Sequence, residues 1–285
     1  MKFGVNTFIW TVNFDAKDLP LLPVLKEHGF DGFECAIFDP PTFPATTIRR
    51  GCQETGLEVS VCSVIPNGLS IVSDDADIRR KTSTYVTDCV KAIADAGGKL
   101  FVGPFYSPVG YLPGRRRTED EWKRCVEAYQ EIGPVCAQHG VTIALEPLNR
   151  FETYFLNTAA DGVRLCDAVG HPNIGLLIDT FHANIEEKSV ANAYRIAARH
   201  LKHVHTCEND RGTPGSGHVD WDGVFEALDE IGYDGWLTIE SFGFAIKEIA
   251  AAACIWRDIE KAPEDIAFEG LRFLRTAHRP ERLSA

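Results

Sequence analysis

The chain has 285 residues, of which 45% are hydrophobic and 25% are charged, a composition typical of a soluble globular protein. No apolar run reaches the roughly 18 residues that a bilayer span requires. Forty-one acidic and 29 basic residues give a formal net charge of −12, which disfavours binding to nucleic acid or to an anionic membrane. Neither kind of partner is therefore expected.

The nine cysteines are scattered and include no C-x-x-C pair, so neither a disulfide framework nor a zinc ribbon is indicated. The first residues, Met1 to Asn6, lead directly into a strand-like segment, without the apolar region and cleavage site of a signal peptide. Together these observations predict a protein of the reducing cytoplasm.

Short apolar segments alternate with helical patterns along the whole chain. The predicted strands are Phe3–Phe8, Gly32–Ile37, Val59–Ser63, Leu100–Gly103, Thr142–Glu146, Gly175–Asp179, His203–Thr206 and Leu237–Glu240. No linker or low-complexity tract interrupts the alternation. Eight such repeats predict an α/β fold, a (β/α)8 TIM barrel, formed by one domain over residues 1–285.

Helices between these strands are marked by apolar spacing and by end signals. Apolar residues between 86 and 93 follow the i, i+3, i+4, i+7 pattern, and Gly97 marks the end of that helix. Thr118 and Glu121 have the spacing of a capping box, which predicts a helix start. A third apolar stripe over 224–231 ends at Gly232.

Four consecutive predicted strands carry a carboxylate or an imidazole at or next to their C-terminal ends, on Glu146, Asp179, His205 and Glu240. In a (β/α)8 barrel the C-terminal strand ends meet on the face that carries the active site, so these side chains are expected to converge. Two glutamates, one aspartate and one histidine form a hard ligand set, which suits Mn²⁺, Mg²⁺ or Co²⁺ better than a structural zinc ion. The sequence therefore predicts a divalent metal centre at the barrel mouth.

Each of these residues also has a simpler interpretation. An acidic residue after a strand often caps a helix, and Asp179 followed by Thr180 fits an N-cap. His203 and His205 share one face of a strand, so either could be the ligand and either could be a buried structural histidine. Position favours His205, which lies nearer the strand end. Four such residues on consecutive strands favour a shared site over separate coincidences.

Four segments of the sequence are distinctive, and they begin at Glu146 (EPLNRFET), Asp179 (DTFHANIEE), His205 (HTCENDRGTPGSGH) and Ile239 (IESF). They resemble the ketose 3-epimerases, the D-tagatose 3-epimerase and D-psicose (D-allulose) 3-epimerase group of the xylose isomerase-like barrels. The similarity extends from the opening GVNTFIWT to the late CIWRD, which covers almost the whole chain.

This resemblance implies an isomerase that interconverts C3 epimers of free ketoses of the D-tagatose/D-sorbose, D-fructose/D-psicose or L-ribulose type. The family's metal ligands fall on Glu146, Asp179, His205 and Glu240, with Mn²⁺ as the expected ion and Co²⁺ or Mg²⁺ as alternatives. Glu146 and Glu240 would also be the catalytic pair, one on each face of C3, alternating as general base and general acid. A homodimer or homotetramer is the expected assembly.

The family's substrate-contacting residues fall on Glu152, His182 and Arg211, which implies hydrogen bonds to the O1 and O2 end of the sugar. Without the resemblance, these three would be interpreted as two surface charges and a helix-start histidine. Candidates for an apolar wall around the sugar, each of which could instead belong to the core, are Phe8, Trp10, Cys62, Phe105, Tyr106 and Trp122. The loop Tyr106–Arg117 differs from the best-known family members, so the preferred ketose stays open.

Three other functions remain open at this point. A sister isomerase of the same barrel group would act on hydroxypyruvate, an inosose or an aldose. An endonuclease IV-like repair enzyme would need more histidine ligands and a basic groove, which the net charge of −12 disfavours. A non-catalytic sugar-binding barrel would not need two carboxylates around one metal ion. The sequence contains no phosphate-binding loop or dinucleotide fingerprint, and inversion at C3 requires neither.

Overall fold

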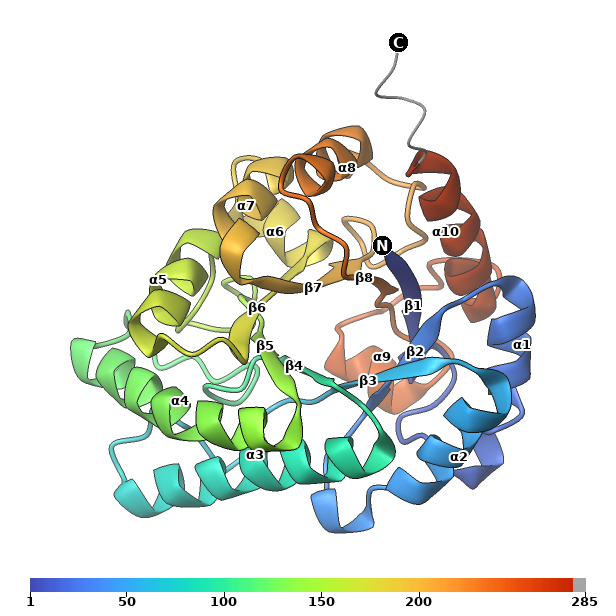
Figure 1. Cartoon of the computed structure of the whole chain (residues 1–285). Coiled ribbons are helices and arrows are strands. Elements are labelled where there is room, and N and C mark those ends of the chain that lie inside the picture. The colour runs from blue at the N-terminus through green and yellow to red at the C-terminus, as the bar shows by residue number, and fades with distance from the viewer. Residues whose placement is uncertain (279–285) are drawn as a thin grey trace.

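The computed structural model describes residues 1–278, which contain a closed barrel of eight parallel strands (Figure 1). The strands are β1 (Lys2–Asn6), β2 (Gly32–Ala36), β3 (Glu58–Cys62), β4 (Leu100–Gly103), β5 (Thr142–Leu145), β6 (Ile174–Asp179), β7 (Leu201–Thr206) and β8 (Trp236–Ile239). They follow one another around the barrel in chain order, and β8 pairs with β1 to close it. The predicted TIM barrel is confirmed.

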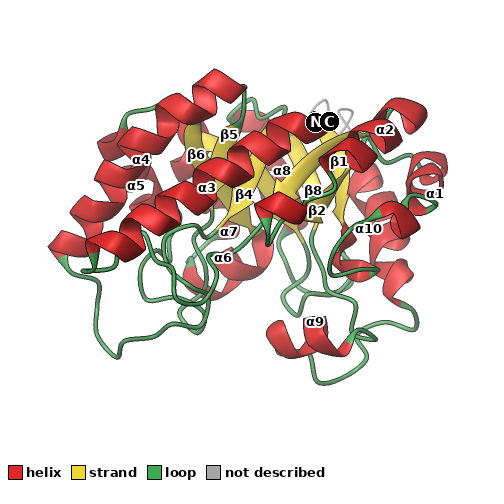
Figure 2. Cartoon of the chain, turned by 90° about the horizontal axis from the view of Figure 1, so that it is seen from below, coloured by secondary structure: helices red, strands yellow, loops and turns green. Residues whose placement is uncertain are grey.

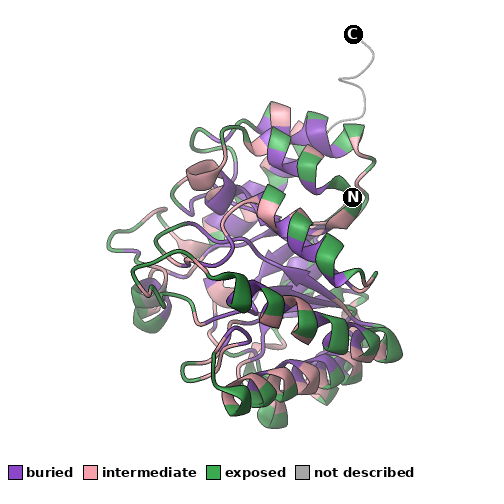
Figure 3. Cartoon of the chain, turned by 90° about the vertical axis from the view of Figure 1, so that its left-hand side faces the viewer, coloured by how far each residue is buried: buried purple, intermediate pink, exposed green. Residues whose placement is uncertain are grey.

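The described residues form ten α-helices, along which buried positions, purple in Figure 3, alternate with exposed ones. They are α1 (Leu21–His28), α2 (Ala45–Thr55), α3 (Ala76–Ala96), α4 (Glu119–His139), α5 (Ala159–Val169), α6 (Thr180–Glu186), α7 (Val190–Ala197), α8 (Trp221–Glu230), α9 (Lys247–Ala252) and α10 (Pro263–Ala277). None of the helices within residues 1–278 is long and apolar enough to cross a membrane.

The predicted helix ends agree with the structure. Helix α3 ends at Gly97, whose φ of 85° is the left-handed conformation that glycine adopts without strain. At the start of α4, the Glu121 N–H donates to Thr118 Oγ1 at 3.2 Å, and the Thr118 N–H donates to Glu121 Oε2 at 2.6 Å. These two bonds are the reciprocal contacts of a capping box.

Strand β1 is shorter than predicted, because the chain leaves the sheet after Asn6. The Asn6 side chain accepts a hydrogen bond from the Phe8 N–H at 2.9 Å and begins a short 3-10 turn over Thr7–Ile9. This turn places Phe8 at the mouth of the barrel, where it lines the cavity described below.

The segments that follow the strands gather at one end of the barrel, together with α9 (Figure 2). At this end β4 finishes at Gly103, whose φ is 142°. A Cβ atom there would lie 2.2 Å from the Ser63 carbonyl oxygen, so the ends of β3 and β4 approach more closely than any side chain allows. This close approach forms part of the cavity lining.

Thr118→Ala is expected to lower the free energy of unfolding by about 1 kcal/mol, because it removes the oxygen that caps α4. Urea unfolding followed by circular dichroism measures the change. Thr276→Ala on α10, where the exposed hydroxyl donates to the Arg272 carbonyl, is the matched control and should stay within about 0.5 kcal/mol of wild type. Equal losses in the two variants would contradict the role assigned to the cap.

Candidate active site

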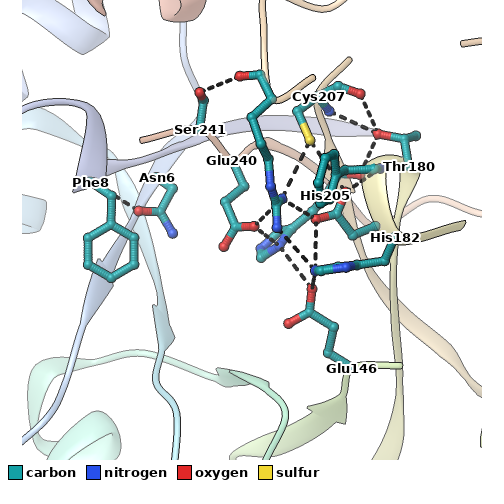
Figure 4. A network of polar contacts seen from close by, with 12 residues as sticks. Asn6, Phe8, Glu146, Thr180, His182, His205, Cys207, Glu240 and Ser241 are labelled. Carbon is teal, nitrogen blue, oxygen red and sulfur yellow. Dashed lines mark hydrogen bonds and ion pairs between the residues drawn. The ribbon is translucent and has the colours of Figure 1, made fainter. Parts of the chain in front are cut away.

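The four strand-end residues predicted as metal ligands come together at the C-terminal end of the barrel. Glu146, Asp179, His205 and Glu240 are all buried, and each offers one donor atom that lies within 4.8 Å of the other three. Figure 4 shows Glu146, His205 and Glu240 pointing toward one another. Three carboxylates and one imidazole thus share one small space.

A cavity of about 300 Å³ opens above this group. Glu146, His205 and Glu240 line it, whereas Asp179 is not among its lining residues. The Asp179 Oδ1 atom accepts a hydrogen bond from the Phe181 N–H at 2.7 Å, so this carboxylate also caps α6. The two interpretations of Asp179 from the sequence are therefore compatible.

The ends of β6 and β7 are tied together next to the acidic group. Thr180 Oγ1 donates to the Cys207 carbonyl at 2.7 Å and accepts from the Cys207 N–H at 2.9 Å. Asp179 precedes Thr180 and is paired in the sheet with His205, which lies two residues before Cys207. This exchange therefore helps to fix the spacing of the two strands at Asp179 and His205.

The guanidinium of Arg211 lies among the carboxylates, and its positive charge offsets part of their negative charge. Its Nη1 donates to Asp179 Oδ2 at 2.6 Å and to Glu240 Oε2 at 2.9 Å. The guanidinium carbon lies 4.1 Å from the ring centre of Phe181 and 5.1 Å from that of Phe242. Arg211 is thus held between two aromatic faces, which restricts its orientation.

The backbone at Arg211 adopts a conformation that is uncommon for a residue with a side chain, with a φ of 68°. Ser241 Oγ donates to the Arg211 carbonyl at 2.5 Å, and the Arg211 N–H donates to the Glu208 carbonyl at 3.0 Å. The Glu208 carboxylate is itself buried and accepts from the indole N–H of Trp221 at 2.6 Å. These bonds hold the loop that turns Arg211 inward.

The fit of a divalent cation to this group can be judged from the atoms that lack partners. Glu146 Oε1 and His205 Nδ1 are buried and have no hydrogen-bond partner within residues 1–278. They lie 4.0 Å apart, and His205 Nδ1 is 3.4 Å from Glu240 Oε2. Buried polar atoms are rarely left unpaired, and a cation bound between them would satisfy both. The residues present therefore fit a divalent metal ion.

The surroundings of Glu146 and Glu240 favour different protonation states. Burial raises the pKa of Glu146 well above its usual range, and the neighbouring Glu240 carboxylate adds to this effect. Burial acts on Glu240 as well, but His205 and Arg211 outweigh it, so the pKa of Glu240 is lowered. The protein itself therefore favours a proton on Glu146 and a negative charge on Glu240.

Of the two histidines on β7, His205 belongs to the group of four and His203 does not. His203 lies deeper in the barrel, without exposed surface, with its ring centre 5.0 Å from that of His205. Both imidazoles approach one carboxylate, Glu34 of β2, to 2.9 Å from His205 Nε2 and 3.1 Å from His203 Nε2. Glu34 lies within a strand and not at its end, so the pattern of strand-end residues in the sequence does not reveal it.

Glu152, His182 and Arg211 all line the cavity. His182 Nδ1 accepts from the Asn149 N–H at 3.1 Å, and its Nε2 lies 3.6 Å from Glu146 Oε1. The Glu152 carboxylate accepts from Asn149 Nδ2 at 2.8 Å. Asn149, which the sequence analysis missed, therefore orients both side chains. It stands three residues after Glu146 in the segment EPLN, in the loop that follows β5.

The apolar wall of the cavity differs from the predicted one. Phe8 and Cys62 line it as predicted, and Phe38 and Phe242 lie beside Phe8, with ring centres 6.2 and 5.7 Å from that of Phe8. The other four candidates pack elsewhere: Trp10 against Phe268, Phe105 against Phe101, and Tyr106 and Trp122 against Phe155. An aromatic residue after a strand gives no sign in the sequence of whether it turns inward or outward.

The loop Tyr106–Arg117 reaches the cavity through Val109. Two arginines near its end are used to anchor it. Arg115 donates to the Glu121 carboxylate at 2.9 and 3.0 Å, and Arg117 donates to Asp161 Oδ2 at 2.9 Å. These side chains are therefore engaged with α4 and α5, and the cavity receives an apolar side chain from this loop.

Comparison with known proteins agrees with this geometry. Residues 22–277 match the family described as xylose isomerase-like TIM barrel. The chain is 40% identical to a probable ketose 3-epimerase of Synechocystis sp. over 98% of this chain and 97% of that protein. It is 33% identical to a D-psicose 3-epimerase of Ruminiclostridium cellulolyticum, covering 93% of this chain and 92% of that protein.

Solved structures show the same similarity. D-psicose 3-epimerase of Clostridium cellulolyticum H10, determined with D-tagatose, superposes with a TM-score of 0.90 at 32% identity, over 97% of this chain and 99% of that one. D-allulose 3-epimerase of Methylomonas sp., in complex with D-allulose, gives a TM-score of 0.92 at 28% identity over 98% and 97%. The chain belongs to the xylose isomerase-like TIM barrel family and, within it, to the ketose 3-epimerases.

Proposed function

We propose that this protein inverts C3 of a free ketose with Glu146 and Glu240 as the proton-transferring pair and one divalent metal ion between them. The observation that carries the proposal is the convergence of these two carboxylates with Asp179 and His205 at the floor of one cavity. Epimerisation at C3 removes a proton next to the C2 carbonyl and returns one to the opposite face. Two carboxylates that reach C3 from different sides meet this requirement.

The placement of the two glutamates supports such a division of labour. Glu146 follows β5 and Glu240 follows β8, and β6 and β7 separate these strands in the barrel wall. Each side chain therefore enters the cavity from its own side. The ionised carboxylate would accept the C3 proton, and the protonated one would deliver its proton to the other face, so the two exchange roles in the reverse reaction.

Glu146, Asp179, His205 and Glu240 would hold the metal ion. When bound, the ion would polarise the carbonyl and stabilise negative charge that develops on the sugar oxygens. One histidine and three carboxylates favour a hard or borderline cation, and we propose Mn²⁺, with Co²⁺ and Mg²⁺ as alternatives.

Glu152, His182 and Arg211 would bind the O1 and O2 end of the sugar. His182 and Arg211 adjoin Glu146 and Glu240, and Glu152 shares Asn149 with His182. The cavity away from these groups is walled by Phe8, Phe38 and other apolar side chains. Among the described residues that line the cavity, Arg211 alone carries a permanent positive charge, which favours a free sugar over a phosphorylated one.

The same geometry bears on the alternative functions. A sister isomerase of the barrel group could use a similar metal centre, so it remains the alternative to be tested. A repair endonuclease would need a basic surface for phosphates, and the cavity floor is acidic. A non-catalytic sugar-binding barrel would gain nothing from two carboxylates with opposed pKa shifts.

A cytoplasmic location, a single domain over all 285 residues and a homodimer or homotetramer stay predictions. For the assembly, the surface to test first lies in the loops after β4 and β5. Four apolar side chains are exposed there, namely Val109, Tyr111, Leu112 and Phe151, the last with 71% of its surface exposed. Light scattering on wild type and on Phe151→Asp would show whether this surface joins two copies.

Incubation with D-fructose, D-psicose, D-tagatose or L-ribulose in D₂O is expected to place deuterium at C3 and to produce the C3 epimer. The label enters because each carboxylate can exchange its proton with solvent. NMR of the isolated product gives both the position of the label and the stereochemistry. Deuterium at C2 of an aldose product would indicate a sister isomerase that works through an enediol, and an aldose with no label would indicate a hydride shift.

Glu146→Gln and Glu240→Gln should each lower kcat by roughly 10²-fold or more, because each removes a proton-transfer group. Glu248→Gln is the matched control, since this carboxylate on α9 lines the same cavity outside the group of four. Its kcat should stay within about threefold of wild type. The two-carboxylate mechanism would be wrong if either active-site variant kept near-native kcat with metal bound.

His182→Ala and Arg211→Ala are expected to raise KM more than they lower kcat, because they remove contacts to the sugar and leave the four ligands in place. Steady-state kinetics with metal analysis of each purified variant checks this expectation. A loss of bound metal in His182→Ala would place that imidazole among the ligands of the ion. A loss in Arg211→Ala would mean that the guanidinium is needed to position Asp179 and Glu240, to which it donates.

A further inference from the structure

Glu34 is a carboxylate with no exposed surface in the middle of β2, and the proposed reaction gives it no role. An ionised carboxylate in a barrel interior is unfavourable unless both oxygens are paired. Four groups that can donate a hydrogen bond surround its two oxygens, from Asn6, Ser60, His203 and His205. Glu34 is therefore placed as a hydrogen-bond acceptor inside the barrel.

The partners of Glu34 come from three other strands. Its Oε1 accepts from Asn6 Nδ2 on β1 at 2.9 Å and lies 2.9 Å from His205 Nε2 on β7. Its Oε2 accepts from Ser60 Oγ on β3 at 2.9 Å and lies 3.1 Å from His203 Nε2. Since β2 and β7 are not neighbours in the barrel, these contacts run across its interior and lock the carboxylate in one orientation.

This orientation decides how His205 can bind a metal ion. A carboxylate oxygen can only accept, so His205 Nε2 must carry the hydrogen in their contact. A metal ligand must be a neutral imidazole, and only Nδ1 can give up its hydrogen without breaking the bond to Glu34. Nδ1 is the nitrogen that faces Glu146 and Glu240, at 4.0 and 3.4 Å.

We infer that Glu34 is a positioning residue of the metal centre, which fixes His205 with Nε2 toward the barrel interior and Nδ1 toward the ion. The inference rests on the proposed metal centre and deepens it. Histidine ligands commonly donate their second ring N–H to a carboxylate, which fixes the ring and raises its basicity. Here the carboxylate lies on a different strand, 171 residues away in the sequence.

The two histidines of β7 contact different oxygens of the Glu34 carboxylate. His203 approaches Oε2 from deeper in the barrel, while His205 uses Oε1. Asn6 and Ser60 each add one hydrogen bond, so the two oxygens are satisfied in different directions. His203 therefore supports Glu34, and His205 is the histidine that remains available to the cavity.

Titration of the full chain with Mn²⁺, followed by EPR of the free ion, tests this assignment without any sugar. Glu34→Gln should raise the Kd for Mn²⁺ by about 10-fold or more, because the negative charge behind the imidazole is lost. Glu34→Ala should raise it further, because glutamine still offers His205 one oxygen and alanine offers none. If Glu34→Ala does not fold, Glu34→Gln, which keeps the volume, decides the outcome.

Glu121→Gln is the matched control. Glu121 is also a buried carboxylate, but its contacts are with Arg115, Thr118 and Tyr154 around the start of α4. The Kd of the Glu121→Gln variant for Mn²⁺ should stay within about threefold of the wild-type value. Equal weakening in the Glu34 and Glu121 variants would assign Glu34 a merely structural role, and an unchanged Kd in Glu34→Gln would overturn the inference directly.

Two further readouts separate positioning from other roles. Electron spin echo modulation of the bound Mn²⁺ should show coupling to one imidazole nitrogen in wild type and a weaker or absent coupling in Glu34→Ala. Binding should saturate at one ion per chain, whereas two ions would mean that Glu34 and His203 themselves hold a metal. Because neither readout involves a ketose, failure of the epimerase assay would leave this test intact.

Discussion

The structure depends on holding three carboxylates together at the buried end of a barrel. Glu146, Asp179 and Glu240 come from three strands, and their donor atoms lie within 4.8 Å of one another and of His205. Like charges at such distances repel strongly where water is excluded, so the arrangement needs positive charge placed with care. The fold supplies part of it through Arg211 and His205, and a divalent cation would complete it.

The supporting residues show how the fold meets this need. Arg211 reaches Asp179 and Glu240 from a backbone conformation with a φ of 68°, which Ser241 and the loop around Glu208 hold in place. From the opposite direction, Glu34 holds His205 across the barrel. The proposed catalytic end is thus fixed by bonds that connect strands far apart in the sequence.

How far the sequence predicts this site depends on what each pattern encodes. The strand ends predicted Glu146, Asp179, His205 and Glu240 as one group, because parallel strands of a barrel carry their C-terminal residues to one face. Glu34 gave no such signal, since its partners lie on other strands. Trp10 and Phe105 were candidates for the cavity wall and pack elsewhere, because the direction of a side chain after a strand depends on the loop's backbone. Asn149 is the opposite case: it stands in a loop after a strand, gave no signal in the sequence, and yet contacts the cavity residues His182 and Glu152.

Whether one metal ion and two opposed carboxylates act on C3 can be seen in a crystal structure of the full chain with Mn²⁺ and a bound ketose. We expect one ion held by Glu146, Asp179, His205 and Glu240, with His205 binding through Nδ1. We also expect C3 of the sugar between the Glu146 and Glu240 carboxylates. An ion held by other residues, or both carboxylates on the same face of C3, would contradict this mechanism.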